Sequence, residues 1–189
     1  MKNIANLLFE ANMLKKIPRS GFHFLGCGKE SIAEHTFSAT FIAYVMAQLE
    51  PEIDALKLIT MCLVHDLPEA RIGDLNTVHK TYVTANETKA VKDTTEGFPF
   101  GGSIADLIGE FNEGRSLEAK LAHDADQLSL ILELKYLSDI GYAPPDKWLP
   151  PVLTRLKTEI SKKIAQRIME TNRDDWWLNN YIDTDFINY

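Results

Sequence analysis

Apolar residues recur at helical spacing along almost the whole chain, and this pattern limits the possible folds more than any other feature. From Ile4 to Leu14 they fall at intervals of three and four, and the same spacing returns over 151–170. Such spacing places apolar side chains on one face of an α-helix. No segment shows a convincing strand pattern. We therefore predict an all-α fold with helices over 3–16, 32–49, 53–67, 85–96, 103–112, 116–140 and 151–170.

Capping and helix-breaking residues set the ends of several of these helices. Ser31 followed by Glu34 is a capping box, which predicts a helix that begins at the next residue after Ser31. Pro68 cannot donate the hydrogen bond that a helix interior requires, so we expect the third helix to stop there and a fresh turn to end at Gly73. Loops are expected at 19–30, at 97–103 and around Pro144 and Pro145.

His65 and Asp66 end an apolar stripe on the third predicted helix. Cys62 lies on that stripe, and Glu69 continues it by another turn. A helix face that is apolar and then becomes His, Asp and Glu directs titratable groups towards the protein interior. Burying these groups without a partner would be costly, so they require hydrogen-bonding partners or a metal.

Two further residues of this kind lie on inward faces of other helices. His35 shares its face with Ala39, and Asp126 shares its own with Ala122. A lone histidine on an apolar face is more often a hydrogen-bonded core residue, and an aspartate within a helix is usually solvated or paired. Two imidazoles and two carboxylates together suit one divalent ion, such as Co, Mn, Zn, Fe, Ni or Mg. The combination favours a metal held by His35, His65, Asp66 and Asp126.

The length and composition fit one globular domain. A chain of 189 residues, 45% hydrophobic and 25% charged, can bury a sizeable core. Neither an internal repeat nor a low-complexity linker divides it, so we assign residues 1–189 to a single domain. We expect a metal-binding core over about 30–140, and a C-terminal helix with an aromatic tail over 150–189.

The net charge of −7 argues against broad electrostatic binding to nucleic acid or to an anionic membrane. It leaves room for a small anionic substrate, because a metal can reverse the local field. No apolar run is long enough to cross a bilayer, and the N-terminus lacks the features of a signal peptide. Cys27 and Cys62 do not suggest a disulfide framework, so we expect a cytoplasmic protein.

Four segments resemble the HD-domain phosphohydrolases, and within them the 5'-deoxynucleotidase and oxetanocin-like branch. They are LKKIPRSGF at 14–22, SIAEH at 31–35, HDLPEARIGDL at 65–75 and AKLAHDADQL at 119–128. The resemblance covers about the first 140 residues. It implies a single-domain helical bundle of the HD type with a metal at its centre.

The resemblance also implies roles for individual residues. Glu69 would be the acid, base or water-orienting carboxylate, and Asp74 would shape the site or hold the attacking water or a sugar hydroxyl. Arg19 would contact phosphate, which its planar fork can bind in a bidentate way. Lys80 is a weaker candidate for the same task, with an ordinary surface lysine as the alternative. The positions that match the family's metal ligands are His35, His65, Asp66 and Asp126.

Three positions leave alternatives open. Ser20 stands where bacterial nucleotidases of this branch carry a tryptophan that is associated with selection of deoxyribose. Asp74 follows a glycine and equally suits a helix N-cap. His123 precedes Asp126 by nearly one turn and is a further ligand, a residue that braces a ligand, or an ordinary helix residue.

Hydrolysis of a phosphate ester is the reaction that the resemblance implies. We predict a phosphohydrolase that removes phosphate from nucleoside 5'-monophosphates, deoxy ones above all, by a metal-activated water. Hydrolysis of nucleoside triphosphates or alarmones is an alternative, although alarmone hydrolases usually carry Glu-Asp where this chain has Glu69 and Ala70. A module that only binds metal or nucleotide is another alternative, but it would not need Glu69.

The chain ends in an aromatic and acidic tail. Because large apolar patches are uncommon on monomers, this tail must pack on its own domain or on a partner chain. Soluble oligomers are mostly symmetric, and the resembled family is commonly dimeric, so we expect a homodimer whose interface the tail forms or braces. A tail folded onto its own bundle is the alternative. The aromatic residues concerned are Trp176, Trp177, Tyr181, Phe186 and Tyr189.

Overall fold

The computed structural model describes residues 2–181, and its regular elements there are all helices. Apart from one isolated bridge between Pro18 and Ser31, this part of the chain has no β-structure, so the predicted all-α fold is confirmed. The helices are α1 (Lys2–Met13), α2 (Phe22–Leu25), α3 (Ile32–Leu49), α4 (Ala55–Val64), α5 (Glu69–Ile72), α6 (His79–Tyr82), α7 (Glu87–Thr95), α8 (Gly101–Glu113), α9 (Leu117–Asp139), α10 (Pro145–Leu153), α11 (Glu159–Glu170) and α12 (Asp175–Tyr181).

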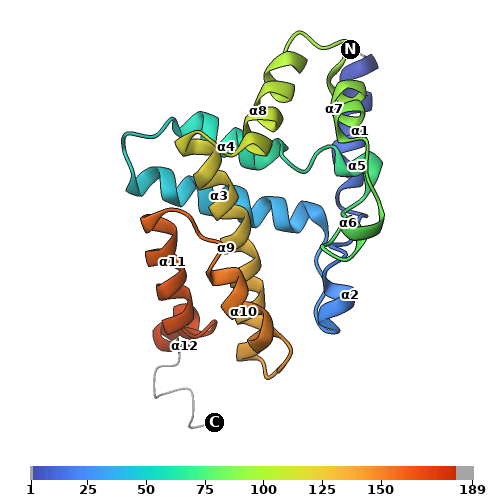
Figure 1. Cartoon of the computed structure of the whole chain (residues 1–189). Helices are drawn as coiled ribbons and strands as arrows, with labels where there is room; N and C mark the ends of the chain where they lie inside the picture. Colours follow the sequence, from blue (N-terminus) through green and yellow to red (C-terminus); the bar gives the residue numbers. More distant parts are fainter. Residues whose placement is uncertain (1, 182–189) are drawn as a thin grey trace.

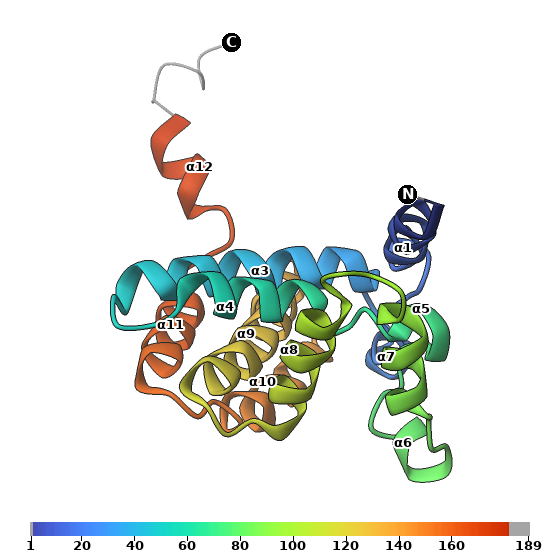
Figure 2. The same cartoon turned by 90° about the horizontal axis from the view of Figure 1, so that it is seen from above.

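The helices form two groups around the long helix α3. Helix α4 lies alongside α3, and α9 crosses both, with α8, α10 and α11 packed around α9 on the same side of the α3–α4 layer (Figures 1 and 2). Helices α1, α5 and α7 form a smaller group beside one end of α3. Helix α12 extends away from the layer (Figure 2).

The core lies where α3, α4 and α9 meet. Small residues are fully buried at the crossing, among them Ala43 of α3 and Ala122 of α9, and they allow the helix backbones to approach closely. Leu58, Met61 and Leu128 are also fully buried there. Burying each of these larger side chains contributes about 2 kcal/mol to folding. Three helices are thus fixed against one another, and each of them contributes to the site.

The helix ends predicted at Ser31, Pro68 and Gly73 are confirmed. The Ser31 hydroxyl accepts the Glu34 N–H, and the Glu34 carboxylate accepts the Ser31 N–H, so α3 begins with a complete capping box. Helix α4 ends before Pro68, and the single turn of α5 follows. Gly73 ends that turn with a φ of 74°, a left-handed value that favours glycine.

The helix predicted over 151–170 is wrong, because the structure breaks it at residues 154–158. Pro144 and Pro145 begin α10 instead of a loop, as prolines can in a first helical turn. The buried Asp124 carboxylate accepts the N–H groups of Lys157 and Thr158, both at 2.8 Å, and so fixes the start of a separate helix α11. The single helical turns α2 and α6 occupy segments in which no helix was predicted.

The aromatic tail lies only partly within the described residues. Trp176 and Trp177 belong to α12, where Trp176 is 74% exposed. The predicted packing of Phe186 and Tyr189 lies outside the described residues. Among residues 2–181, no helix combines the length and the apolar character that a membrane span requires.

Candidate metal centre

Three side chains from three helices converge in the interior. His35 lies on α3, His65 directly follows α4, and Asp126 lies on α9. One ligand atom from each lies within 4.8 Å of the other two. His35 Nε2 and Asp126 Oδ1 are 2.8 Å apart. The cluster is close to the size of a metal site, since two atoms that are each about 2.1 Å from one ion lie within about 4 Å of each other.

His65 is oriented by the backbone of its own helix. Its Nδ1 lies 2.8 Å from the carbonyl oxygen of Cys62. A carbonyl oxygen only accepts hydrogen bonds, so Nδ1 must carry the proton. Nε2 then presents a lone pair to the cluster, and it is buried without a hydrogen-bond partner. Metal-binding histidines are typically held in this way.

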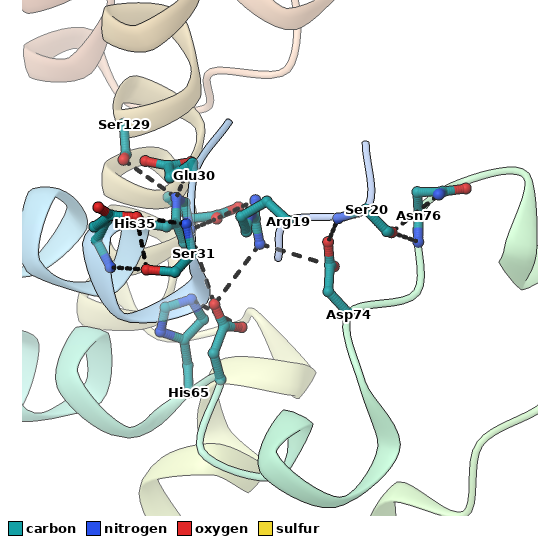
Figure 3. Close-up of polar contacts among 12 residues, drawn as sticks. Arg19, Ser20, Glu30, Ser31, His35, His65, Asp74, Asn76 and Ser129 are labelled. Atoms are coloured by element: carbon teal, nitrogen blue, oxygen red, sulfur yellow. Dashed lines mark hydrogen bonds and ion pairs between the residues drawn. The ribbon is translucent and has the colours of Figure 1, made fainter. Parts of the chain in front are cut away.

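His35 is oriented from its far side as well. It is fully buried, and its Nδ1 lies 3.2 Å from Ser129 Oγ and 3.9 Å from Glu30 Oε2 (Figure 3). These groups hold Nδ1 while Nε2 faces Asp126. Both histidines therefore direct Nε2 towards the same point.

Asp66 borders the cluster formed by the other three residues. Its Oδ1 lies 3.3 Å from His65 Nε2, and its Oδ2 lies 3.9 Å from His35 Nε2. Asp66 Oδ2 is buried without a hydrogen-bond partner, as is His65 Nε2. Two buried acceptors without hydrogen bonds, on neighbouring residues, would be costly unless a cation binds them. The residues present thus fit a divalent ion, and the donor set of two imidazoles and two carboxylates suits a borderline metal.

Arg19 reaches this cluster from the loop after α1. Its guanidinium lies 3.9 Å from Asp74 (Figure 3). It also lies 3.8 Å from Asp66 and 4.0 Å from Asp126. Burial opposes its charged form, but the charges of these carboxylates raise the pKa of Arg19 above its ordinary value. Burial would likewise raise the pKa of Asp126, but its hydrogen bond with His35 and the nearby positive charges hold that pKa well below its usual range.

Glu69 lies at the start of α5 with one carboxylate oxygen unpaired. Its Oε2 is buried and has no hydrogen-bond partner. Burial, followed by the charges of Asp66 and Asp74, raises the pKa of Glu69 to about 9. A carboxyl group in this position can exchange a proton with a molecule in the adjacent cavity. A cation held by the cluster would counter the negative charges that surround it.

Asp74 and Ser20 join two loops that border the site. Asp74 Oδ2 accepts the Ser20 N–H at 2.6 Å, and Ser20 Oγ accepts a hydrogen bond from the side-chain amide of Asn76 at 2.9 Å (Figure 3). Asn76, not Asp74, accepts the first backbone N–H groups near α6, so the N-cap alternative for Asp74 is not what the structure shows. Ser20 is buried in this junction, which holds the Arg19 loop in place.

A cavity of about 750 Å³ opens beside the cluster. His35 is fully buried and does not line this cavity. Lys80 lies on the exposed side of the cavity, on α6. Aromatic and aliphatic side chains, including Phe22 and Trp148, line other parts of the cavity wall. The predicted site residues that do line it are Arg19, His65, Asp66, Glu69, Asp74, Lys80 and Asp126.

His123 braces the wall of this cavity. Its Nε2 donates to the carbonyl oxygen of Phe111 at 2.8 Å, and its ring stacks on the Phe111 ring with centroids 4.0 Å apart. The Phe111 ring also packs against the His65 ring, with centroids 4.6 Å apart. His123 therefore supports His65 through Phe111, and it is outside the group of potential ligands found among the described residues.

Sequence reasoning missed the groups that orient the two histidines. The Cys62 carbonyl has no sequence signal, because every residue carries one. Glu30 lies in a loop whose path only the fold defines. Ser129 had a readable signal, since it lies three residues after Asp126 and therefore on nearly the same face of α9.

The fold and the site together define a helical protein with a buried His/Asp metal centre beside a cavity. Residues 11–169 match the family model of the HD domain. The chain belongs to the HD domain family, as its sequence motifs indicated.

Known proteins similar to this chain include enzymes and structures from distant organisms. The 5'-deoxynucleotidase HDDC2 of Homo sapiens is 24% identical over 149 residues, which are 76% of this chain and 72% of the relative. The protein of the same name from Xenopus laevis is 24% identical over 188 residues, 91% of this chain and 92% of the relative. A conserved hypothetical protein from Pyrococcus furiosus has a TM-score of 0.76 and 30% identity, over 88% of this chain and 99% of the other.

Proposed function

We propose that this protein is a metal-dependent phosphohydrolase that removes the phosphate from nucleoside 5'-monophosphates, with deoxynucleotides as its preferred substrates. The observation that carries the proposal is the position of Arg19, which lies within 4.0 Å of two carboxylates of the metal centre and lines the same cavity. The Arg19 guanidinium, which could bind a phosphate, therefore lies next to the residues that could bind a metal ion. The family membership and the relatives named 5'-deoxynucleotidase support the same function.

His35, His65, Asp66 and Asp126 would hold the ion, and Asp66 would join the three residues that already converge. When bound, a divalent ion lowers the pKa of water and offsets charge on a phosphoryl group. The ion would be one of Co, Mn, Zn, Fe, Ni and Mg.

The remaining residues of the site bind the phosphate and move protons. Arg19 would bind the phosphate oxygens and neutralise the charge that builds up as the ester bond breaks. Glu69 would orient the attacking water and pass a proton to the departing sugar oxygen. Asp74 would hold the Arg19 loop in position through its hydrogen bond with the Ser20 N–H. Lys80 would add positive charge on the exposed side of the cavity.

The proposal is tested by phosphate release after metal removal. The chelated protein is assayed with one metal at a time, on deoxyadenosine 5'-monophosphate, adenosine 5'-monophosphate and deoxyadenosine 5'-triphosphate. We expect inorganic phosphate from the monophosphates, more from the deoxy form, and none without metal. Hydrolysis of the triphosphate alone would instead favour the alternative activity within the superfamily.

A pair of histidine variants controls this assay. His65→Ala removes a group of the cluster and should abolish turnover. His23→Ala alters an exposed histidine of α2 and should leave turnover unchanged. Equal activity of the two variants would contradict the proposed centre, and binding of metal and nucleotide without turnover would favour a non-catalytic module.

We further propose that the protein is a cytoplasmic homodimer. Helix α3 carries an exposed aromatic stripe formed by Phe37, Phe41 and Tyr44, whose neighbouring rings lie 6.3 and 6.1 Å apart. Helix α1 adds the exposed Leu8 and Phe9. Helices α1 and α12 flank the α3–α4 layer in Figure 2. An apolar surface of this kind suits a second copy of the chain, and α12 would brace that interface.

A further inference from the structure

The cavity has an apolar end beyond the metal centre, and two helices supply it. On α9 the lining residues Asp126, Gln127 and Leu130 lie on one helix face. Leu130 is four residues beyond Asp126, which is about 6 Å along the helix axis. On α10 the residues Lys147, Trp148, Pro151 and Val152 line the cavity, and Arg155 lines it just after the helix ends. Along α9 the lining thus changes from the charged Asp126 to the apolar Leu130 over a distance comparable with one sugar ring.

Trp148 is the largest side chain at this apolar end. It is half-buried, and one atom of its ring lies 3.9 Å from the position that a Cβ atom on Gly21 would take. The indole therefore lies against the same turn that carries Arg19, so the phosphate-binding loop and the ring form adjacent walls. The part of the indole that remains uncovered lines the cavity.

Three polar side chains line the cavity near Trp148, namely Gln127 and the exposed Lys147 and Arg155. The Gln127 side-chain amide donates to Asp126 Oδ2 at 2.7 Å, so it is held towards the metal centre. Arg155 is exposed and lies 3.4 Å from the Gln127 side-chain oxygen. A ligand with an anionic end at Arg19 would therefore present its other end to a flat apolar wall. A planar aromatic group matches that wall, because ring stacking covers indole surface without requiring hydrogen bonds.

We propose that Trp148 stacks on the nucleobase of the substrate and is the specificity-determining residue that separates nucleotides from other phosphate monoesters. This inference rests on the proposed nucleotidase function. Stacking by itself contributes to binding and not to the chemical step, since the base is remote from the bond that breaks. Removal of the ring therefore raises KM for nucleotides and leaves kcat unchanged.

The test compares a substrate that has a base with one that lacks it. Steady-state kinetics are measured on deoxyadenosine 5'-monophosphate and on 2-deoxyribose 5-phosphate, for the wild-type protein, Trp148→Ala and Trp148→Phe. Loss of one stacked base is expected to raise KM about 10-fold for the nucleotide in Trp148→Ala. KM for the sugar phosphate should stay within about 2-fold. Trp148→Phe retains a ring and should recover most of the loss.

Trp176→Ala is the matched control, because it removes an exposed indole on α12 and should change neither KM. The proposal is overturned if Trp148→Ala raises KM equally for both compounds, or if KM for the nucleotide does not change. Circular dichroism of each variant separates these results from misfolding.

A binding experiment decides the inference if the wild-type protein hydrolyses neither compound. Deoxyadenosine 5'-monophosphate is titrated while tryptophan fluorescence is recorded. Quenching that is present in the wild-type protein and in Trp176→Phe, and that disappears in Trp148→Phe, supports stacking even if the nucleotidase proposal fails. Quenching that persists in Trp148→Phe, or no quenching at all, overturns the inference.

Discussion

Each histidine of the centre is held by a group on its far side, and this explains how the side chains stay directed at one point. The Cys62 carbonyl fixes the tautomer of His65, and Ser129 contacts the buried Nδ1 of His35. Such supporting groups raise the affinity of a site for metal because the ligands need not be reoriented on binding.

The contact from Ser129 gives a first prediction. Ser129→Ala should lower metal affinity about 10-fold, the lower end of the effect seen when a group that orients a ligand is removed. Competition with a fluorescent chelator measures the change. Ser138→Ala is the control, because Ser138 lies on the same helix but donates its hydrogen bond to Asp146. Equal affinities of the two variants would show that Ser129 has no orienting role.

Glu69 allows proton transfer to be separated from metal binding. Glu69→Gln keeps the size of the side chain and should retain the metal, because Glu69 is not one of the converging ligands. Turnover should fall about 100-fold, as expected when a positioned acid or base is lost. Metal analysis and phosphate release are measured on the same sample. Undiminished turnover would assign Glu69 a structural role.

Arg19 tests how phosphate is recognised. Arg19→Lys preserves the charge near Asp66 and Asp126 but removes the planar fork that can bind two phosphate oxygens. We expect a fall of about 10-fold or more in kcat/KM, with an unchanged melting temperature. Kinetics equal to those of the wild-type protein would show that a positive charge at this position is sufficient and that the planar fork has no role in phosphate binding.

The identities of the candidate ligands could be predicted from sequence, whereas their partners could not. His35, His65 and Asp126 each continue an apolar helical face, so their inward direction follows from periodicity. Arg19 and Glu30 lie outside such a pattern, in a loop. Their positions depend on how that loop packs against α3, which single-sequence periodicity does not encode.

At the scale of helices, the sequence predicted a helix end well where the residue that determines the end lies close to it in the chain. The capping box at Ser31 and the break at Pro68 are of this kind. The break between α10 and α11 depends on Asp124, which lies more than 30 residues earlier. An apolar stripe that runs through 151–170 conceals that break, because both helices pack against the same core.

Asp124 therefore gives a prediction about stability. It is fully buried and accepts hydrogen bonds from the Lys157 N–H, the Thr158 N–H and the Thr158 hydroxyl. Asp124→Ala should lower the free energy of unfolding by about 2–4 kcal/mol, since buried donors lose their acceptor. Asp54→Ala removes an exposed cap of α4 and should cost about 1 kcal/mol. Urea unfolding compares them, and equal losses would contradict the bracing role of Asp124.

At the scale of the whole molecule, the exposed stripe of α3 tests the proposed dimer. Phe41→Glu places a charge in the middle of the stripe, so it should shift the mass measured by light scattering from dimer to monomer at tens of micromolar. Tyr82→Glu, at an 83% exposed position on α6, should remain dimeric. A wild-type protein that is monomeric at that concentration would defeat the dimer proposal.

The central claim is that α3, α4 and α9 bring together the ligands of one catalytic divalent ion, and anomalous diffraction tests it most directly. Crystals of protein loaded with Mn or Co are measured at the absorption edge of the metal. We expect one strong peak per chain, about 2.0–2.4 Å from atoms of the four residues. A fully occupied ion bound elsewhere, or no peak beside these residues in active protein, would contradict the account. The four residues are His35, His65, Asp66 and Asp126.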